Sequence, residues 1–282
     1  MFSSMMRADV VAHLELETDI RQAIERKELV LYYQPIMNLK KCKITGFEAL
    51  VRWLHPKRGL IAPDEFIPFA EETGLIIPLG EWILTEACQQ LRTWHKTQPA
   101  LKDATVSVNL SSKQFSQPNL ANQVENILKD TDLEPQFLRL EITESNLMEN
   151  AEFGIAALKQ LRSLGVQIDV DDFGTGYSSL VYLHQLPLNA IKIDRSFISG
   201  SVGSADGMRI VQSIIRLAQD LKMETVAEGV ENLEQIDQLQ KLGCDYIQGY
   251  LLAKGFPNEM IEQFVSVDIK RINGLCRTKR MK

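Results

Sequence analysis

Residues 166–172 read Val-Gln-Ile-Asp-Val-Asp-Asp, and this heptapeptide carries the strongest indication of the fold. Alternate side chains of an extended chain point to opposite faces, so its three apolar residues share one face while Asp169 and Asp171 share the other. The same alternation recurs at residues 106–110 (Val-Ser-Val-Asn-Leu) and 138–142 (Leu-Arg-Leu-Glu-Ile). We expect the apolar faces to pack on helices and the polar faces to point into a closed barrel near its C-terminal rim.

Strand-like and helix-like segments alternate along most of the chain. Strands are expected at Leu29–Tyr33, Ile44–Val51, Thr105–Leu110, Phe137–Ile142, Val166–Val170, Ala190–Ile193, Thr225–Ala227 and Tyr246-Ile247. Pro35 is expected to interrupt the first of them. Helices are expected near residues 17–26, 64–73, 79–96, 121–129, 151–164, 204–221 and 231–242. This alternation predicts a parallel sheet, and the number of strands favours a modified TIM-like (β/α)8 barrel over an open doubly wound sheet.

The composition is that of a globular protein with a large core. Of 282 residues, 45% are hydrophobic and 24% are charged, so a core of this size needs neither disulfides nor a structural metal. The net charge of −6 argues against a nucleic-acid-binding protein, which would normally be basic. We expect no membrane span, because no apolar run approaches the roughly 20 residues required, and the first six residues do not resemble a signal peptide. The four cysteines lack zinc-binding spacing and are expected to be reduced thiols of a cytoplasmic protein.

Oxygen-bearing side chains stand at the ends of five apolar segments. They are Glu48, Asn109, Glu141, the pair Asp171-Asp172, and Glu228, with Lys192 and Gln248 closing the series. A cluster of inward carboxylates repels itself unless positive charge occupies it. Neutralisation by Arg or Lys is the alternative to bound cations, but Lys192 is the one base expected to point inward. Oxygen ligands with an adjacent carboxylate pair suit Mg²⁺ or Mn²⁺, and a pair of such ions can hydrolyse a phosphate ester.

A series of motifs, in one order along the chain, carries a family resemblance. They are Tyr33-Gln34-Pro35, EALVRW (48–53), PDEFIP (63–68), AEETGL (70–75), VNLS (108–111), EITES (141–145), DDFGTGYSSL (171–180), Lys192-Ile193-Asp194, VAEGVE (226–231) and Gln248-Gly249-Tyr250. On these residues the chain resembles the EAL domain, the family of bacterial cyclic di-GMP phosphodiesterases, over roughly residues 17 to 262. The resemblance implies metal-dependent hydrolysis of cyclic di-GMP to linear pGpG, with two ions of Mg²⁺ or Mn²⁺ in the active site.

The resemblance also implies a role for individual side chains. Glu48, Asn109, Glu141 and Asp171 would bind the first metal ion, and Asp171, Asp172 and Glu228 the second. Lys192 would hold the nucleophilic water, Gln248 would orient water or a metal-bound group, and Glu231 would support them from the segment that follows. Glu144 would pin the Asp172–Ser179 loop, and Gln34, Leu50 and Arg52 would contact the substrate. One departure affects the edge of the substrate pocket, because Gly255 follows Lys254 where the family more often has proline.

Two other functions stay open. Some EAL domains bind cyclic di-GMP as receptors without turnover, although such receptors usually lack a metal ligand or the glycine loop, and both are present here. A metal-dependent barrel hydrolase could also act on another phosphodiester, since the two-metal chemistry alone does not choose a substrate. The resemblance further implies a homodimer, with the loop after Asp171-Asp172 near the interface.

The chain is expected to divide into three parts. Residues 1–16 form an N-terminal extension or linker, residues 17–265 the phosphodiesterase barrel, and residues 266–282 a basic tail that is expected to be solvated. The helix up to Arg26 either joins the barrel to an upstream sensory or GGDEF domain or closes the bottom of the barrel, and both interpretations stay open.

Overall fold

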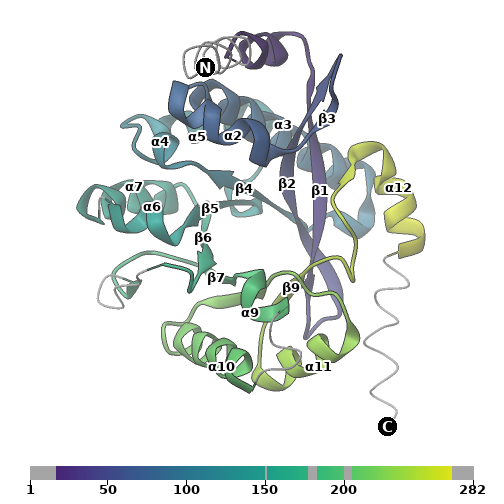
Figure 1. Cartoon of the computed structure of the whole chain (residues 1–282), viewed down its shortest axis with the longest axis vertical. Coiled ribbons are helices and arrows are strands. Elements are labelled where there is room, and N and C mark those ends of the chain that lie inside the picture. Colours follow the sequence, from purple (N-terminus) through teal and green to yellow (C-terminus); the bar gives the residue numbers. More distant parts are fainter. Residues whose placement is uncertain (1–16, 150, 177–182, 200–204, 269–282) are drawn as a thin grey trace, which may run out of the picture.

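A barrel of β-strands, surrounded by helices, forms the centre of the molecule (Figure 1). The computed structural model describes residues 17–149, 151–176, 183–199 and 205–268. Within them the barrel strands are β1 (Leu29–Asn38), β2 (Lys43–His55), β4 (Thr105–Leu110), β5 (Leu138–Thr143), β6 (Gln167–Phe173), β7 (Ala190–Ile193), β8 (Glu224–Ala227) and β9 (Tyr246–Gln248). Two short strands extend this sheet, β3 (Gly59–Ile61) beside β2 and β10 (Phe256–Pro257) beside β1. The predicted TIM-like barrel is confirmed.

Helices follow most of the strands. They are α2 (Pro63–Thr73), α3 (Ile76–Thr97), α4 (Ser112–Phe115), α5 (Leu120–Thr131), α6 (Glu144–Glu149), α7 (Ala151–Ser163), α9 (Arg195–Ser199), α10 (Ala205–Asp220), α11 (Leu233–Leu242) and α12 (Ile261–Gln263). Residues 17–25 are also helical. Single turns occur at η1 (Pro99–Leu101), η2 (Pro135–Phe137), η3 (Asn258–Met260) and η4 (Phe264–Asp268). Gly243 ends α11 in the left-handed conformation, as its position in the sequence predicts.

The first strand departs from a parallel barrel. β1 pairs antiparallel with both β2 and β9, whereas β2 and β4 to β9 pair in parallel. The cause is local, because only residues 39–42 join β1 to β2, and a connection that short can reverse the chain but cannot cross over a sheet. In this turn Cys42 adopts a positive φ of 49°, and the Asn38 side chain accepts a hydrogen bond from the backbone N–H of Lys41.

The expectation that Pro35 interrupts the first strand is wrong. β1 continues through it to Asn38, pairing Pro35 with Phe47 of β2. On its other side, β1 pairs with β10 as far as Tyr33 and with β9 only from Ile36 onward. Pro35 therefore lies between the two pairings, where the ladder does not need the N–H that proline lacks.

The two faces of the barrel strands have different environments. The apolar residues of β4, β5 and β6 are buried in the main hydrophobic core together with residues of the surrounding helices. Inside the barrel, Ile36, Ala190 and Val226 form a small separate cluster. Arg139 also lies on the inward face, where its guanidinium donates to both carboxylate oxygens of Asp169 at 2.6 and 2.9 Å. The expectation that Lys192 is the one inward base is therefore wrong.

Several expectations concern residues outside the described ranges. These are the N-terminal extension at 1–16, most of the basic tail at 266–282, and Tyr177, Ser178 and Ser179 of the glycine loop. Among the helices that the structure does describe, none combines the length and apolar character needed to cross a membrane.

Candidate active site

A cavity of about 460 Å³ opens at the rim where the parallel strands end. It is lined by Gln34, Glu48, Asp64, Asn109, Asp171, Asp172, Asp194, Arg195, Glu228, Gly229, Glu231, Gln248, Gly249 and Tyr250. Side chains from β1, β2, β4, β6 and β9 thus reach one cavity, as the residues at the strand ends predict. TIM-like barrels bind their ligands at this rim.

Lys192 lies at the centre of the cluster and is 1% exposed. Its Nζ is 2.6 Å from Glu141 Oε2, 2.7 Å from Glu228 Oε1 and 3.0 Å from Asp171 Oδ1. Glu48 Oε2 is farther away, at 3.8 Å. One buried ammonium therefore links carboxylates from four strands or strand ends, which holds them together despite their mutual repulsion.

A single ammonium does not balance this negative charge. Burial, the largest influence, disfavours the charged form of Lys192, but its carboxylate neighbours outweigh burial and raise the pKa of Lys192 well above its usual value. Burial also raises the pKa of Glu141 well above its usual value and that of Glu228 to about 7, and in both cases nearby carboxylates add to the rise while Lys192 opposes it. Four carboxylates thus contact one ammonium and Asp172 adds a fifth negative group beside them, so the cluster can accept further positive charge.

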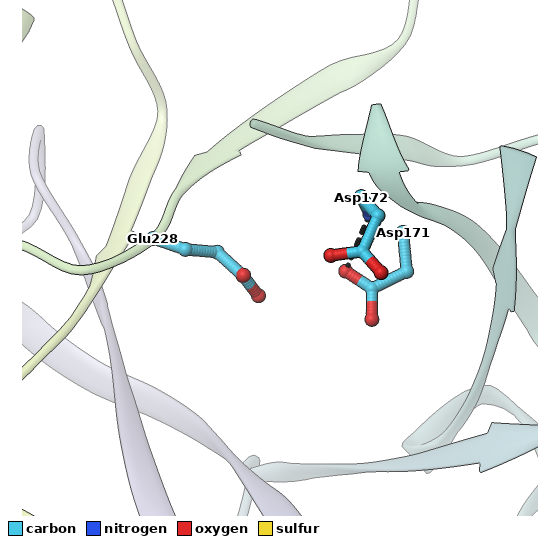
Figure 2. A group of neighbouring side chains, drawn as sticks. All are labelled: Asp171, Asp172 and Glu228. Atoms are coloured by element: carbon cyan, nitrogen blue, oxygen red, sulfur yellow. Dashed lines mark hydrogen bonds between the residues drawn. The ribbon is translucent and has the colours of Figure 1, made fainter. Parts of the chain in front are cut away.

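Asp171 and Asp172 both face the cavity because strand β6 is irregular at its end. Adjacent residues of a regular strand point to opposite faces, but the pairing of β6 with β7 shifts register between Val170 and Phe173. Asp172 also adopts a positive φ of 53°, and its N–H donates to Asp171 Oδ1 at 3.0 Å. Figure 2 shows the two aspartates side by side with Glu228 pointing toward them, and oxygens of all three lie within 4.8 Å of one another. The irregularity is a β-bulge, and it directs the carboxylates of both aspartates toward the same site.

Two amide side chains hold Glu48. Asn109 Nδ2 donates to Glu48 Oε1 at 2.7 Å, and Gln248 Nε2 donates to Glu48 Oε2 at 2.5 Å and to Gln34 Oε1 at 3.0 Å. The remaining oxygen of Gln248, Oε1, is buried and has no hydrogen-bond partner among the residues that the structure describes. Such a buried acceptor is costly unless something donates to it or coordinates it. The all-oxygen donor set, the excess negative charge and this unsatisfied acceptor all fit hard divalent cations.

The three residues expected to contact the substrate do not line one common cavity. Gln34 lines the acidic cavity, and Leu50 lines a neighbouring cavity of about 330 Å³ that shares Asp64 and Asn109 with it. Arg52 lines neither of these two cavities. Its guanidinium stacks over the ring of Tyr32, 5.6 Å from the centroid, and donates to the carbonyl of Val51.

The two supporting glutamates also lie at this rim. Glu144, the first residue of α6, is 3% exposed and accepts a hydrogen bond from the N–H of Gly174 at 3.0 Å. A Cβ on Gly176 would lie only 3.3 Å from Glu144 Oε1, so the described part of the glycine loop passes close to this carboxylate. Glu231 lines the acidic cavity, and its backbone N–H donates to the Gln235 side chain.

Besides Gly229 and Gly249, four cavity-lining residues were not predicted from the sequence. Asp64, Asp194 and Tyr250 belong to motifs that the sequence already singled out, and Arg195 directly follows one of them, but spacing alone gave them no role. Asp64 and Arg195 each stand in the first turn of a helix that follows a strand, which is the signal that could have placed them at this rim.

The model of the EAL domain family matches residues 17–255. The bifunctional diguanylate cyclase/cyclic di-GMP phosphodiesterase MucR of Pseudomonas aeruginosa is 46% identical over 92% of this chain and 38% of its own length. The cyclic di-GMP phosphodiesterase NbdA of the same organism is 42% identical over 94% of this chain and 34% of its own. A solved structure described as the PaMucR phosphodiesterase in complex with c-di-GMP superposes with a TM-score of 0.84 at 46% identity, covering 88% of this chain and 99% of the other. The chain thus spans less than two fifths of the length of these two curated relatives.

Proposed function

This chain belongs to the EAL domain family, and from that premise we propose that it hydrolyses cyclic di-GMP to linear pGpG and so lowers this second messenger in bacterial signalling. The observation that carries the proposal is the cluster of five carboxylates around Lys192 at the barrel rim. Similar proteins named as cyclic di-GMP phosphodiesterases, and a similar structure with c-di-GMP bound, support the choice of substrate.

Divalent metal ions are part of the proposal, with Mg²⁺ or Mn²⁺ as the expected ions and two ions in the site. Glu48, Asn109, Glu141 and Asp171 would hold one ion, and Asp171, Asp172 and Glu228 the other. When bound, such ions supply positive charge to the phosphate oxygens and make water a stronger nucleophile. The distances within the group formed by Asp171, Asp172 and Glu228 support the second ligand set.

Lys192 and Gln248 act on the reacting groups in this proposal. Water adds to one phosphorus, the bond from that phosphorus to its ribose O3′ breaks, and the proton lost by the water ends on the released hydroxyl. The Lys192 ammonium offsets the negative charge that grows on the phosphate during this step. Gln248 Oε1, which is buried and unsatisfied, is available to accept a hydrogen bond from the water and orient it.

The remaining residues position these groups or the substrate. Glu144 holds the backbone after Asp172 through the N–H of Gly174, and Glu231 lines the cavity beside Gln248. Gln34 and Leu50 contact the substrate from the two cavities that they line, and Arg52 would have to leave its contacts with Tyr32 and Val51 to do so. Gln34 also accepts a hydrogen bond from Gln248, so substrate binding and water orientation share one amide pair.

Finer parts of the proposal concern the protein in its cell. We place the enzyme in the cytoplasm as a homodimer, with residues 17–265 as the catalytic unit between an N-terminal linker and a basic C-terminal tail. An upstream sensory or GGDEF domain is its proposed regulator. Activity that depends on protein concentration, measured together with light scattering, tests the dimer.

The second candidate function is a cyclic di-GMP receptor that binds without turnover. Two observations favour the enzyme over the receptor. All the side chains expected to bind metal are present and converge on one site, and Gly174 of the glycine loop donates a hydrogen bond to Glu144.

Chromatographic assay of cyclic di-GMP turnover by the purified chain separates these functions. Product should form with Mg²⁺ or Mn²⁺ and should disappear with a chelator or in the Asp171→Asn variant. Tight binding of cyclic di-GMP with no product under any metal condition would instead favour the receptor, and neither binding nor turnover would refute both.

A further inference from the structure

Tyr250 exposes an aromatic ring at the mouth of the acidic cavity. The residue is 60% exposed and lines the cavity together with Gln248 and the carboxylates. By contrast, Tyr33 is 1% exposed in the core. A large ring left in water beside a binding site is a surface on which a flat ligand group can stack.

The backbone that carries Tyr250 is held in place on both sides. The N–H of Val230 donates to the carbonyl of Gln248 at 3.0 Å, and the N–H of Leu251 donates to the carbonyl of Val230 at 3.0 Å. The carbonyl of Gly249 accepts from the N–H of Leu252 at 3.1 Å. The ring therefore projects from an ordered turn that is continuous with Gln248, and a ligand that stacks on it meets a positioned surface.

A cation lies next to this ring. The Nζ of Lys254 is 5.2 Å from the centroid of Tyr250, within the range of a cation–π contact. Lys254 is exposed at the rim, whereas the cavity lining is dominated by carboxylates. The Tyr250–Lys254 pair thus combines a π surface with a positive charge at the entrance of a site that must accept an anion.

We infer that the Tyr250–Lys254 pair is the platform on which a guanine base of the substrate stacks, with Lys254 drawing the adjoining phosphate toward the cavity. This inference rests on the proposed function and names the residues that recognise the nucleobase. A purine presents a π face of the size of the tyrosine ring, and stacking requires the ring but not its hydroxyl. The platform binds the substrate and takes no part in bond cleavage.

Steady-state kinetics on the full chain tests the platform. Tyr250→Ala should raise the KM for cyclic di-GMP about 10- to 100-fold, the range expected for one base stacked on an aromatic ring, while kcat changes less than about threefold. Tyr250→Phe keeps the ring and should retain the wild-type KM. The Mn²⁺ concentration that gives half-maximal activity should be the same in all three proteins, because Tyr250 is not a metal ligand. Lys254→Met should raise KM by a smaller factor that shrinks as salt is added.

The control is Met260→Ala, which truncates another exposed side chain, outside the cavity lining, and should leave KM unchanged. An unchanged KM in Tyr250→Ala overturns the inference, as does a Phe variant that is as impaired as the Ala variant. If the wild type neither binds nor hydrolyses cyclic di-GMP, the proposed function fails separately. Calorimetric titration with GMP then decides the inference: weaker binding by Tyr250→Ala than by wild type supports stacking, and equal or absent binding refutes it.

Discussion

At Asp172, one backbone angle brings a second carboxylate into the cavity. Its φ of 53° lies in the left-handed region, which costs a residue other than glycine about 1 kcal/mol or more and is least costly for Asn and Asp. The surrounding hydrogen bonds, from its own N–H to Asp171 and from Gly174 to Glu144, keep this conformation. A substitution that tolerates the positive φ but lacks the carboxylate charge can therefore test the two properties of Asp172 separately.

Asp172→Asn should lower turnover about 100-fold or more, because it removes one charge from the group proposed to bind metal. The melting temperature should stay within a few degrees of wild type, since Asn also tolerates a positive φ. The matched control is Asp132→Asn, since Asp132 has a φ of 56° at the exposed end of α5. Turnover assays and thermal melts of both variants check this, and wild-type turnover in Asp172→Asn would remove that residue from the metal site.

Residue-level prediction from the sequence succeeded where the signal was local. The strand ends placed Asn109, Glu141 and Asp171 on the inward side, and alternation within the strand was sufficient for that. By the same alternation Asp172 should point away, and only the register shift between β6 and β7 turns it inward. Arg139 was not counted as an inward base, although the same alternation puts it on one face with Glu141; its pairing with Asp169 of the next strand is visible only in the structure.

The elements were predictable in kind and order, but not in the details that long-range pairing decides. Helix and strand periodicity gave the alternating pattern, and Gly243 marked the end of α11. The continuation of β1 through Pro35 depends on which neighbours pair with it on each side, and sequence alone does not show this. The predicted strands ended at Tyr33 and began again at Ile44, so the short link at residues 39–42 that makes β1 antiparallel appears only in the structure.

The turn that follows β9 gives an element-scale prediction. A Cβ on Gly249 would lie 2.2 Å from both the backbone N and O of Val230, so Gly249→Ala must push the turn away from the segment that follows β8. Because Gln248 is adjacent, its contacts with Glu48 and Gln34 should be lost with it. We expect a loss of about 1–3 kcal/mol in the free energy of unfolding, as for other overpacked sites, and a fall in turnover.

Gly255→Ala is the matched control in the same segment. Its Cβ would lie 3.4 Å from Leu50 Cδ1, which is ordinary van der Waals contact. The free energy of unfolding should stay the same or rise by about 0.4–1 kcal/mol, the usual effect of Gly→Ala where the conformation allows it. Denaturant titrations and turnover assays compare the two variants, and equal behaviour would mean that the close approach of Gly249 to Val230 has no consequence for the site.

On the scale of the whole molecule, the barrel interior has two polar ends with different charge balance. Toward the N-terminal ends of the strands, Arg139 pairs with Asp169 and lies 3.5 Å from Glu224. At the opposite rim, four carboxylates contact Lys192 and Asp172 lies beside them. The first end has one base for one buried and one partly exposed carboxylate, whereas the second carries a larger excess of negative charge. Divalent cations should therefore stabilise the fold through the rim alone.

Thermal unfolding with Mn²⁺ or with a chelator tests this asymmetry. An ion at about 100 times its Kd stabilises a protein by about 2.7 kcal/mol, which for a chain of this size raises Tm by roughly 5–10 °C. Lys192→Met should have the lowest Tm in chelator and the largest gain with Mn²⁺, because removing the ammonium leaves the carboxylates uncompensated. Asp169→Asn breaks the pair at the other end, so its Tm should fall while its gain with Mn²⁺ equals that of wild type. Equal gains in all three proteins would mean that cations do not relieve the charge around Lys192, and the metal assignment of the rim would then be wrong.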